Sequence, residues 1–242
     1  MNILKWFSDL IFPEGITCNF CGDEVFHNES HSLCEKCIKE LPFMPNNVCK
    51  ICGGDLVADE KVCLFCKNSK RYFDIARAPF VYKDGVANAI KSFKYKNRRY
   101  LAKTFAHFLA IEFYKNDFKP DLIIPIPLHE KRYKKRGYNQ SELLAVELSK
   151  IIDVKVDTKA FQKIKHTEFQ TNLNYEERQE NLKESFAVVD KEVLKNKSIL
   201  LIDDVFTTGA TLKTASKCLK TNGKVKKIFC LTVAHRILEE VH

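Results

Sequence analysis

The stretch SILLIDDVFTTGATLKTA, residues 198–215, contains the features that decide the fold. Its first half is an apolar strand pattern that ends in two adjacent carboxylates, Asp203 and Asp204. A turn with three threonines and Gly209 follows, and then a helical pattern begins. Backbone N–H groups at a helix N-terminus bind anions, and glycine lets a backbone approach a phosphate closely. The stretch therefore predicts a strand, an anion-binding turn and a helix; a buried strand before an N-capped helix is the simpler alternative.

The pattern around this stretch alternates between strands and helices. Short apolar runs predict strands, and apolar residues at helical spacing predict helices. This alternation favours an α/β fold with a doubly wound, mostly parallel sheet, in which ligands bind at the carboxyl ends of the strands. We expect strands at 75–82, 121–127, 160–165, 186–189, 198–203 and 225–234, helices at 138–152 and 210–222, and one long or two shorter helices within 84–117.

Eight of the ten cysteines lie in four C-x-x-C pairs. A C-x-x-C turn presents two thiolates to one metal ion, and two such turns complete a tetrahedral zinc site. The spacing therefore predicts two structural zinc sites. Sequential use of the pairs gives two tandem ribbons, and an interleaved, cross-braced arrangement is the alternative. The expected ligands are Cys18, Cys21, Cys34, Cys37, Cys49, Cys52, Cys63 and Cys66.

The charge of the chain is divided between two regions. The 242 residues carry a formal net charge of +9, but residues 1–70 hold 7 Lys and Arg against 10 Asp and Glu, and residues 71–242 hold 33 against 21. We therefore expect an acidic zinc-ribbon module over 1–70 and a basic domain over 71–242. No apolar run approaches the ~20 residues of a membrane span, and the first residues are not typical of a secretory signal. These features favour a cytoplasmic protein.

Residues 199–211 resemble the ribose-phosphate signature of type I phosphoribosyltransferases, which bind phosphoribosyl pyrophosphate (PRPP). The resemblance implies a Rossmann-like fold, with contacts from Asp203 and Asp204 to the ribose 2′- and 3′-hydroxyls. It also implies Mg²⁺ bound together with PRPP. The 5′-phosphate would bind to the loop formed by Val205, Phe206, Thr207, Thr208, Gly209, Ala210 and Thr211.

Further motifs resemble the ComF family. They are PIPLHEKRYKKRGYNQSELLA over 125–145, Lys165–His166–Thr167 with Gln170, and then Arg178, Asn181 and Phe186. That family joins a cysteine-rich zinc module to a phosphoribosyltransferase-like domain and is linked to DNA uptake in natural competence. The resemblance extends from Cys18 to about Ala234.

A basic loop after the 121–127 strand is the candidate pyrophosphate site. Arginine suits pyrophosphate because its guanidinium donates to two oxygens at once. We expect Arg132, Arg136 and Gly137 to bind the pyrophosphate, and a solvated charged loop is the alternative.

The polar stretch 166–184 is a candidate lid, because phosphoribosyltransferases close a loop over the site to exclude water. The candidate cations at its base are Lys165 and His166, which would act together with the carboxylates at the end of the 198–203 strand. The candidate catalytic residues are Asp203, Asp204, Lys165 and His166.

A second basic stretch, residues 91–103, is interleaved with aromatic residues. Basic side chains track phosphates, and aromatic rings offer stacking surfaces for single-stranded bases. The stretch therefore indicates a surface for single-stranded DNA, and a solvated helix face that covers its own core is the simpler alternative. The candidate nucleic-acid ligands are Lys94, Lys96, Arg98 and Arg99.

These observations support two functional hypotheses. In the first, the protein binds PRPP and handles incoming single-stranded DNA in natural competence, with a helicase-type DNA-uptake translocase at the inner face of the membrane as its partner. In the second, it is an active phosphoribosyltransferase that transfers ribose 5-phosphate from PRPP to an unidentified base or amine and releases pyrophosphate. Both hypotheses predict PRPP binding.

Overall fold

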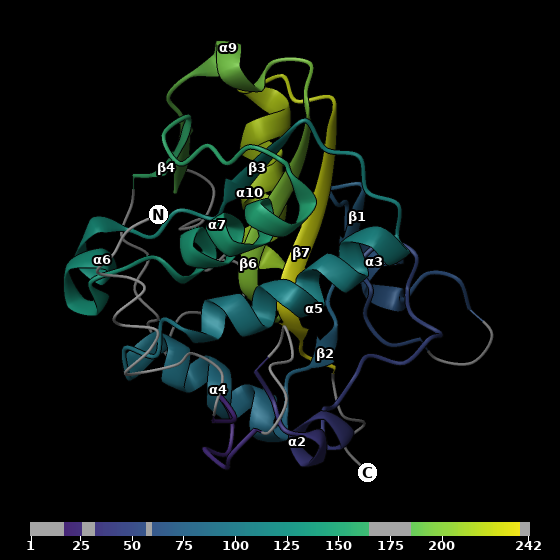
Figure 1. Ribbon diagram of the computed structural model, residues 1–242. Helices are drawn as coiled ribbons and strands as arrows, with labels where there is room; N and C mark the ends of the chain where they lie inside the picture. The colour runs from purple at the N-terminus through teal and green to yellow at the C-terminus, as the bar shows by residue number, and fades with distance from the viewer. Residues whose placement is uncertain (1–16, 26–31, 57–59, 165–184, 238–242) are drawn as a thin grey trace, which may run out of the picture.

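The computed structural model describes residues 17–25, 32–56, 60–164 and 185–237. Its centre is a parallel sheet with the strand order β1–β7–β6–β3, in which the short β2 also pairs with β7 (Figure 1). The predicted parallel sheet is therefore confirmed. Its strands are β1 (Ile75–Arg77), β2 (Phe80–Val81), β3 (Leu122–Pro125), β6 (Ser198–Phe206) and β7 (Lys227–His235).

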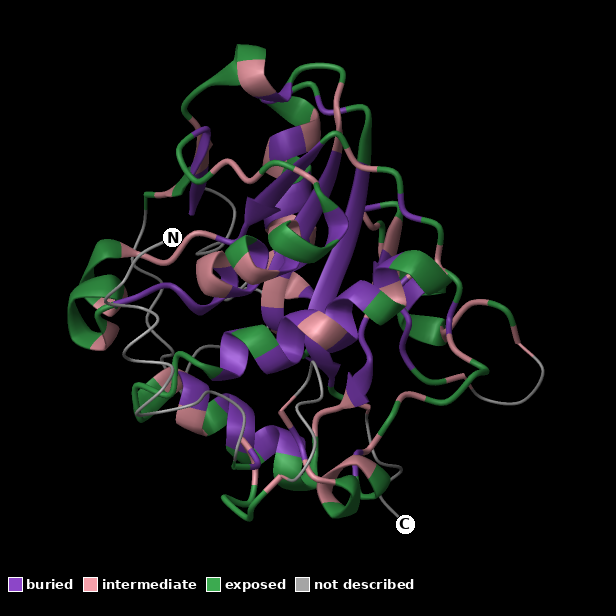
Figure 2. Cartoon of the chain, viewed as in Figure 1, coloured by how far each residue is buried: buried purple, intermediate pink, exposed green. Residues whose placement is uncertain are grey.

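Helices cover both faces of this sheet. Among the described residues of the domain that follows the cysteine-rich segment, here called the body, the helices are α4 (Asp84–Tyr95), α5 (Leu101–Lys115), α6 (Glu130–Arg136), α7 (Gln140–Ile152), α9 (Lys191–Leu194) and α10 (Ala210–Thr221). Successive side chains of a strand point to opposite faces, so β6 contributes to two cores. Leu200 and Ile202 pack with α4, α5 and α7, whereas Ile199 and Leu201 pack with α10. Figure 2 shows the sheet buried between these layers, as a doubly wound fold requires.

Of the two alternatives for residues 84–117, the one with two shorter helices is confirmed: α4 and α5 flank an exposed corner at 96–100. Other elements differ from the sequence prediction. The basic stretch expected as a loop contains α6, which the His129 side chain caps and Gly137 ends with a φ of 77°. The strands predicted at 160–165 and 186–189 are β4 (Phe161–Lys163) and β5 (Phe186–Val188), and they pair with each other in antiparallel fashion apart from the main sheet.

The cysteine-rich segment packs directly against the body. Its short helices are α2 (Glu35–Lys39) and α3 (Leu64–Asn68). Leu33 and Leu41 are buried in the same core as Phe105 of α5. Cys49, Cys52 and Cys66 are buried in the core that α10 covers. The segment therefore completes both cores of the sheet.

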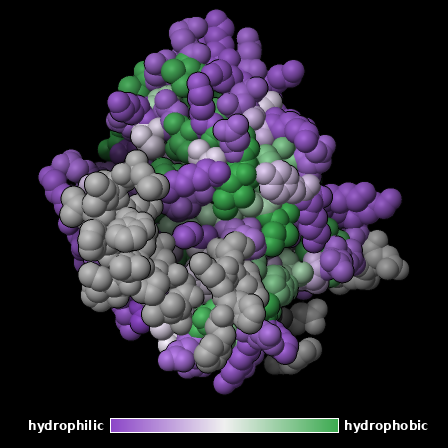
Figure 3. Space-filling model, viewed as in Figure 1, coloured by the Kyte–Doolittle hydropathy of each residue, from purple (hydrophilic) through white to green (hydrophobic). Residues whose placement is uncertain are grey.

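The outward faces of α5 and α7 carry exposed apolar side chains. Ile111, Tyr114 and Ile151 are 50%, 60% and 44% exposed, and the Tyr114 hydroxyl donates to the carbonyl of Ile151 across the two helices at 3.3 Å. Figure 3 shows hydrophobic atoms gathered over these helices within a largely hydrophilic surface. Within the described ranges, every helix is too short or too polar to cross a bilayer.

Candidate functional site

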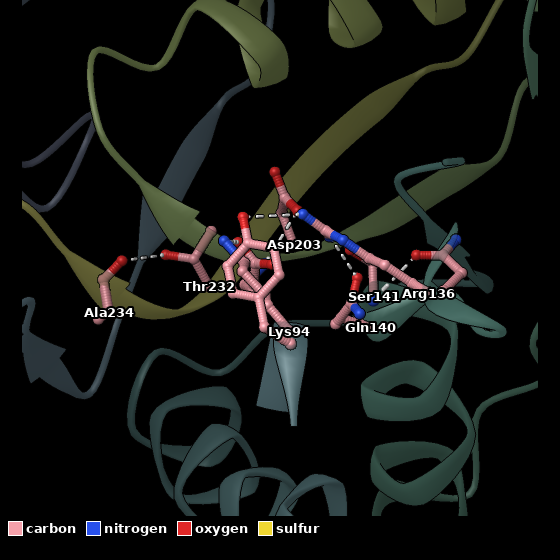
Figure 4. Close-up of polar contacts among 10 residues, drawn as sticks. Lys94, Arg136, Gln140, Ser141, Asp203, Thr232 and Ala234 are labelled. Atoms are coloured by element: carbon pink, nitrogen blue, oxygen red, sulfur yellow. Dashed lines mark hydrogen bonds and ion pairs between the residues drawn. The ribbon is translucent and has the colours of Figure 1, made fainter. Parts of the chain in front are cut away.

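The carboxylates Asp203 and Asp204 lie near the carboxyl end of β6, in the middle of the sheet. Figure 4 shows Asp203 there beside Ser141. Asp203 Oδ1 accepts hydrogen bonds from Ser141 Oγ at 3.0 Å and from the Asp204 amide at 2.9 Å. Ser141 belongs to the first turn of α7, where Asn139 caps the helix and also donates to the carbonyl of Ile126, just after β3. Two neighbouring strands and α7 therefore fix the position of Asp203.

Asp204 forms an ion pair with Lys94, a residue of α4 that reaches into the site. Lys94 Nζ lies 2.7 Å from Asp204 Oδ1. Burial lowers the pKa of Lys94, but the charge of Asp204 outweighs this effect and leaves that pKa above its ordinary value. Burial and the charge of Asp204 raise the pKa of Asp203 to about 7, although Lys94 opposes the rise. Asp203 therefore changes its charge near neutral pH.

The predicted 5′-phosphate loop connects β6 to α10. Thr207 and Thr208 are exposed, and Thr208 Oγ1 accepts from the Ala210 amide at 3.4 Å. Gly209 has a φ of 69°, and a Cβ at this position would lie 2.5 Å from Cζ of the Phe206 ring. Glycine is therefore required, and the exposed hydroxyls stand at the N-terminus of a helix, where an anion is favoured. Three further predicted members of the loop are partly exposed, namely Val205, Ala210 and Thr211.

Phe206 supports this loop from the protein interior. Its ring is buried and stacks on the imidazole of His235, with the ring centres 4.4 Å apart. His235 in turn lies against Gly54, where an added Cβ would be 3.0 Å from its Cε1 and 3.4 Å from Cys52 Sγ. A continuous packed path thus joins the second group of cysteines to the turn at Gly209.

The cysteines form two clusters, one of Cys18, Cys21, Cys34 and Cys37 and the other of Cys49, Cys52, Cys63 and Cys66. The tandem arrangement is therefore confirmed, and the cross-braced alternative is wrong. Within each cluster the sulfurs lie within 4.8 Å of one another. The Cys21–Cys34 and Cys52–Cys63 sulfurs are 3.7 and 3.6 Å apart. These distances fit the ~3.8 Å edge of a tetrahedron with Zn–S bonds of about 2.3 Å.

Backbone amides also point at the cysteine sulfurs. The Cys37 amide donates to Cys34 Sγ at 3.5 Å, and the Gly54 and Cys63 amides donate to sulfurs of the second cluster at 3.4 Å. Such bonds stabilise thiolates, which are the zinc-binding form of cysteine. Both clusters are thus suited to structural zinc.

The predicted pyrophosphate residues Arg132 and Arg136 lie one turn apart on α6 and so share a face of that helix. Arg136 Nη1 donates to Gln140 Oε1 at 2.8 Å and Nη2 to the Tyr95 hydroxyl at 3.2 Å. Gly137 follows as the left-handed residue that ends the helix. Both arginines border a cavity of about 670 Å³, a size typical of small-molecule sites. It is lined by Lys94, Tyr95, Asn97, Lys131, Arg132, Lys135, Arg136 and Tyr138.

The four predicted nucleic-acid residues fall into two groups. Lys96, Arg98 and Arg99 are exposed on the corner between α4 and α5. The Arg99 guanidinium lies 4.6 Å from the centre of the Tyr138 ring, close to the cavity. Lys94 is adjacent in sequence but belongs to the carboxylate site, where it is only 21% exposed. Of the four residues, Lys94 is therefore the one that is paired within the carboxylate site.

Lys163 at the end of β4 is a further cation near the site, which sequence analysis missed. Burial and the positive charge of Arg132 lower the pKa of Lys163, and the negative charge of Asp203 opposes this. Lys163 is therefore close enough to interact with both groups. A single lysine in a short strand gives no functional signal in the sequence. The predicted catalytic cations and lid lie outside the described residues; they are Lys165, His166 and the stretch 166–184.

Two family models match the chain. The double zinc ribbon domain matches residues 7–67, and the phosphoribosyl transferase domain matches residues 103–241. Competence protein F of Haemophilus influenzae is 32% identical over 85% of this chain and 91% of its own length. Competence protein ComFC of Bacillus subtilis is 26% identical over 83% of each chain. DNA utilization protein YhgH of Escherichia coli K12 is 24% identical over 82% of this chain and 96% of its own length.

Similar solved structures include two phosphoribosyl-transferring enzymes. Purine phosphoribosyltransferase from Pyrococcus horikoshii is 18% identical with a TM-score of 0.32, over 56% of this chain and 81% of that one. Glutamine PRPP amidotransferase from B. subtilis is 14% identical with a TM-score of 0.39, over 55% of this chain and 26% of that one. The family models, the identity to Competence protein F and the order of elements agree: the chain belongs to the ComF family, with a double zinc ribbon before a type I phosphoribosyltransferase fold.

Proposed function

We propose that this protein binds PRPP with Mg²⁺ and handles incoming single-stranded DNA during natural competence. One observation carries the PRPP part of the proposal. The carboxylate pair at the end of β6 is followed directly by the phosphate loop, and through Lys94 it borders the basic cavity. PRPP carries a ribose between a phosphate and a pyrophosphate, and this order of groups corresponds to the order of the three subsites.

Each part of PRPP has proposed ligands in this arrangement. The ribose hydroxyls bind to Asp203 and Asp204, and the 5′-phosphate binds to the amides and hydroxyls of 207–211. Arg132, Arg136 and Gly137 bind the pyrophosphate. Mg²⁺ prefers oxygen ligands and would be held by the pyrophosphate with the carboxylates, where it offsets the negative charge of the leaving group.

The DNA part of the proposal rests on the relatives and on one surface. Three relatives are named for competence or DNA utilization. The corner between α4 and α5 exposes Lys96, Arg98 and Arg99 beside Tyr95 and Tyr100, which are 69% and 50% exposed. Cations next to accessible aromatic rings suit single-stranded DNA. We propose a cytoplasmic protein that receives DNA from a helicase-type translocase at the inner face of the membrane.

Active phosphoribosyl transfer is the second candidate, and the presence of both carboxylates with a paired cation favours it. In that reaction the C1–O bond of PRPP breaks and pyrophosphate leaves with the bonding electrons. The acceptor nitrogen forms the new bond to C1 and then loses its proton. The protein would act by positioning and by charge, with Lys165 and His166 as the proposed catalytic cations.

Calorimetric titration with PRPP and Mg²⁺ tests the shared part of both candidates. We expect the wild type to bind and Asp204→Ala to bind at least about tenfold more weakly, since a charge-assisted hydrogen bond contributes about 1.5–3 kcal/mol. Asp190→Asn, a change to the exposed carboxylate that caps α9, should bind like the wild type. A wild-type protein that does not bind PRPP would overturn the proposal.

Two further measurements separate the candidates. One is the release of pyrophosphate from PRPP with a panel of bases and amines, and the other is the binding of a labelled oligonucleotide. Salt-sensitive oligonucleotide binding that Arg98→Ala weakens, without pyrophosphate release, supports the first candidate. Pyrophosphate release that Asp204→Ala abolishes, without oligonucleotide binding, supports the second and overturns the first.

A further inference from the structure

The stretches predicted for two different ligands form two walls of a single cavity. Tyr95 and Asn97 come from the end of α4 and the corner that follows it, within the stretch predicted to bind single-stranded DNA. Arg132 and Arg136 come from α6, the element predicted to bind pyrophosphate. About 40 residues separate the walls in sequence, and the fold brings them together.

The two walls are in direct contact. Arg136 donates to the Tyr95 hydroxyl at 3.2 Å, and its guanidinium lies 5.0 Å from the centre of the Tyr95 ring. Arg99 also lies against the residue that ends α6, since a Cβ added at Gly137 would be 3.4 Å from its guanidinium Nη2. A ligand that binds to α6 therefore also meets the ring that would stack a DNA base.

The cavity has the charge to attract a polyanion, and two anions bound to the same cations would repel each other. Its volume is about 670 Å³, within the range of about 300–1,000 Å³ that holds one drug-sized ligand. Two anionic groups seated together 4 Å apart would repel by about 4 kcal/mol at an effective dielectric constant of about 20. Among the described residues that line it, none is acidic, and five are cations: Lys94, Lys131, Arg132, Lys135 and Arg136.

We propose that PRPP and single-stranded DNA compete for this cavity. The pyrophosphate of PRPP and a DNA phosphate with its base on Tyr95 use the same cations of α6, so one ligand excludes the other. This inference rests on the proposed function, because it requires that both ligands bind. It adds that a DNA-bound molecule holds no PRPP, and that PRPP at sufficient concentration releases the DNA.

A competition titration tests the inference. The anisotropy of a fluorescent oligo(dT) is measured with the full-length, zinc-loaded protein at constant ionic strength, while PRPP with Mg²⁺ is added. Competition raises the apparent Kd of the oligonucleotide by one plus the ratio of PRPP to its Kd, which is about elevenfold at ten times that Kd. Pyrophosphate with Mg²⁺ should also raise it. Ribose 5-phosphate should not, because it lacks the group that enters the cavity.

Matched variants on α6 show whether the cavity is the shared site. Lys131→Ala together with Lys135→Ala removes two exposed cations that line the cavity, and we expect both ligands to bind at least about tenfold more weakly. Lys134→Ala is the control. Lys134 lies on the same helix and pairs with Glu130 at 2.6 Å, but it does not line the cavity. This variant should bind both ligands within about twofold of the wild type.

The outcomes separate the inference from the proposed function. If the wild type fails to bind PRPP or the oligonucleotide alone, the proposed function is wrong and the inference falls with it. If both bind alone but saturating PRPP leaves the Kd of the oligonucleotide unchanged or lowers it, the inference is wrong and the proposed function stands. Competition by ribose 5-phosphate as strong as that by PRPP would also overturn the inference, because it would place the competition outside the cavity.

Discussion

Replacement of Asp203 by asparagine should make the protein more stable while it weakens PRPP binding. Burial and the charge of Asp204 raise the pKa of Asp203 to about 7 in the folded protein, from an ordinary value of 3.8. Between about pH 4 and pH 7 the folded state therefore keeps a proton that the unfolded state has released, so stability falls as the pH rises through this window. Above pH 7 the buried charge costs at most about 4 kcal/mol, from about three pKa units at ~1.4 kcal/mol each.

Asparagine removes this cost and keeps the local geometry. Its Oδ1 can still accept hydrogen bonds from the Ser141 hydroxyl and the amide of residue 204. We expect the free energy of unfolding to rise by about 3 kcal/mol at pH 6 and about 4 kcal/mol at pH 8.5. Urea denaturation followed by circular dichroism measures both values. PRPP binding should weaken about 30-fold, because a charge-assisted hydrogen bond contributes about 2 kcal/mol.

Asp190→Asn is the matched control for the change in net charge. Asp190 is exposed and caps α9 by accepting from the amides of Glu192 and Val193, and asparagine caps a helix equally well. Its stability should stay within about 0.5 kcal/mol of the wild type at both pH values. If Asp203→Asn is no more stable than this control, or if its gain does not grow from pH 6 to pH 8.5, then the buried charge does not cost what we infer.

Three further results are expected. Calorimetry should show that the affinity of the wild type for PRPP with Mg²⁺ falls about tenfold from pH 8 to pH 6, because Asp203 takes up a proton in this range. In Asp203→Asn this pH dependence should be much smaller. Gly209→Ala should lower the free energy of unfolding by more than about 1 kcal/mol in urea denaturation, because residue 209 has a φ of 69° and the new Cβ would lie 2.5 Å from the Phe206 ring. Gly85→Ala should not, because the atom nearest to its new Cβ, in the Phe20 ring, is 3.8 Å away. Metal analysis should find two zinc ions per chain, and Cys52→Ser should lower the melting temperature more than Cys21→Ser because Cys52 is buried in the core.

Local sequence patterns were sufficient to predict the features whose interacting residues are neighbours in the sequence. The strand, carboxylates, glycine turn and helix of 198–215 form one continuous unit, so the pattern of this stretch contains the information for it. The tandem pairing of the cysteines follows from the same principle, because each cluster uses neighbouring C-x-x-C turns.

Contacts that depend on the tertiary fold were not predictable in this way. Lys94 has basic neighbours in sequence, and only the packing of α4 against the sheet brings its ammonium to Asp204. The charges of Arg132 and Asp203 act on the pKa of Lys163, although the three residues come from separate elements. The helix α6 is different, because its signals were present: Glu130 in the first turn, basic residues in the last turn and Gly137 as the left-handed end. The prediction of a basic loop after the 121–127 strand nevertheless does not use these signals.

The burial of the second zinc ribbon against β7 has a consequence for how the chain reaches its folded state. Cys49 and Cys52 share a core with Ile228 and Cys230, and Gly54 lies against His235. A ribosome makes this ribbon long before it makes β7, so the buried face of the ribbon stays open to water until residues 227–235 are added. We therefore expect the ribbon and β7 to become fully stable together, and a chain interrupted before β7 to present the apolar face of the ribbon to chaperones and proteases.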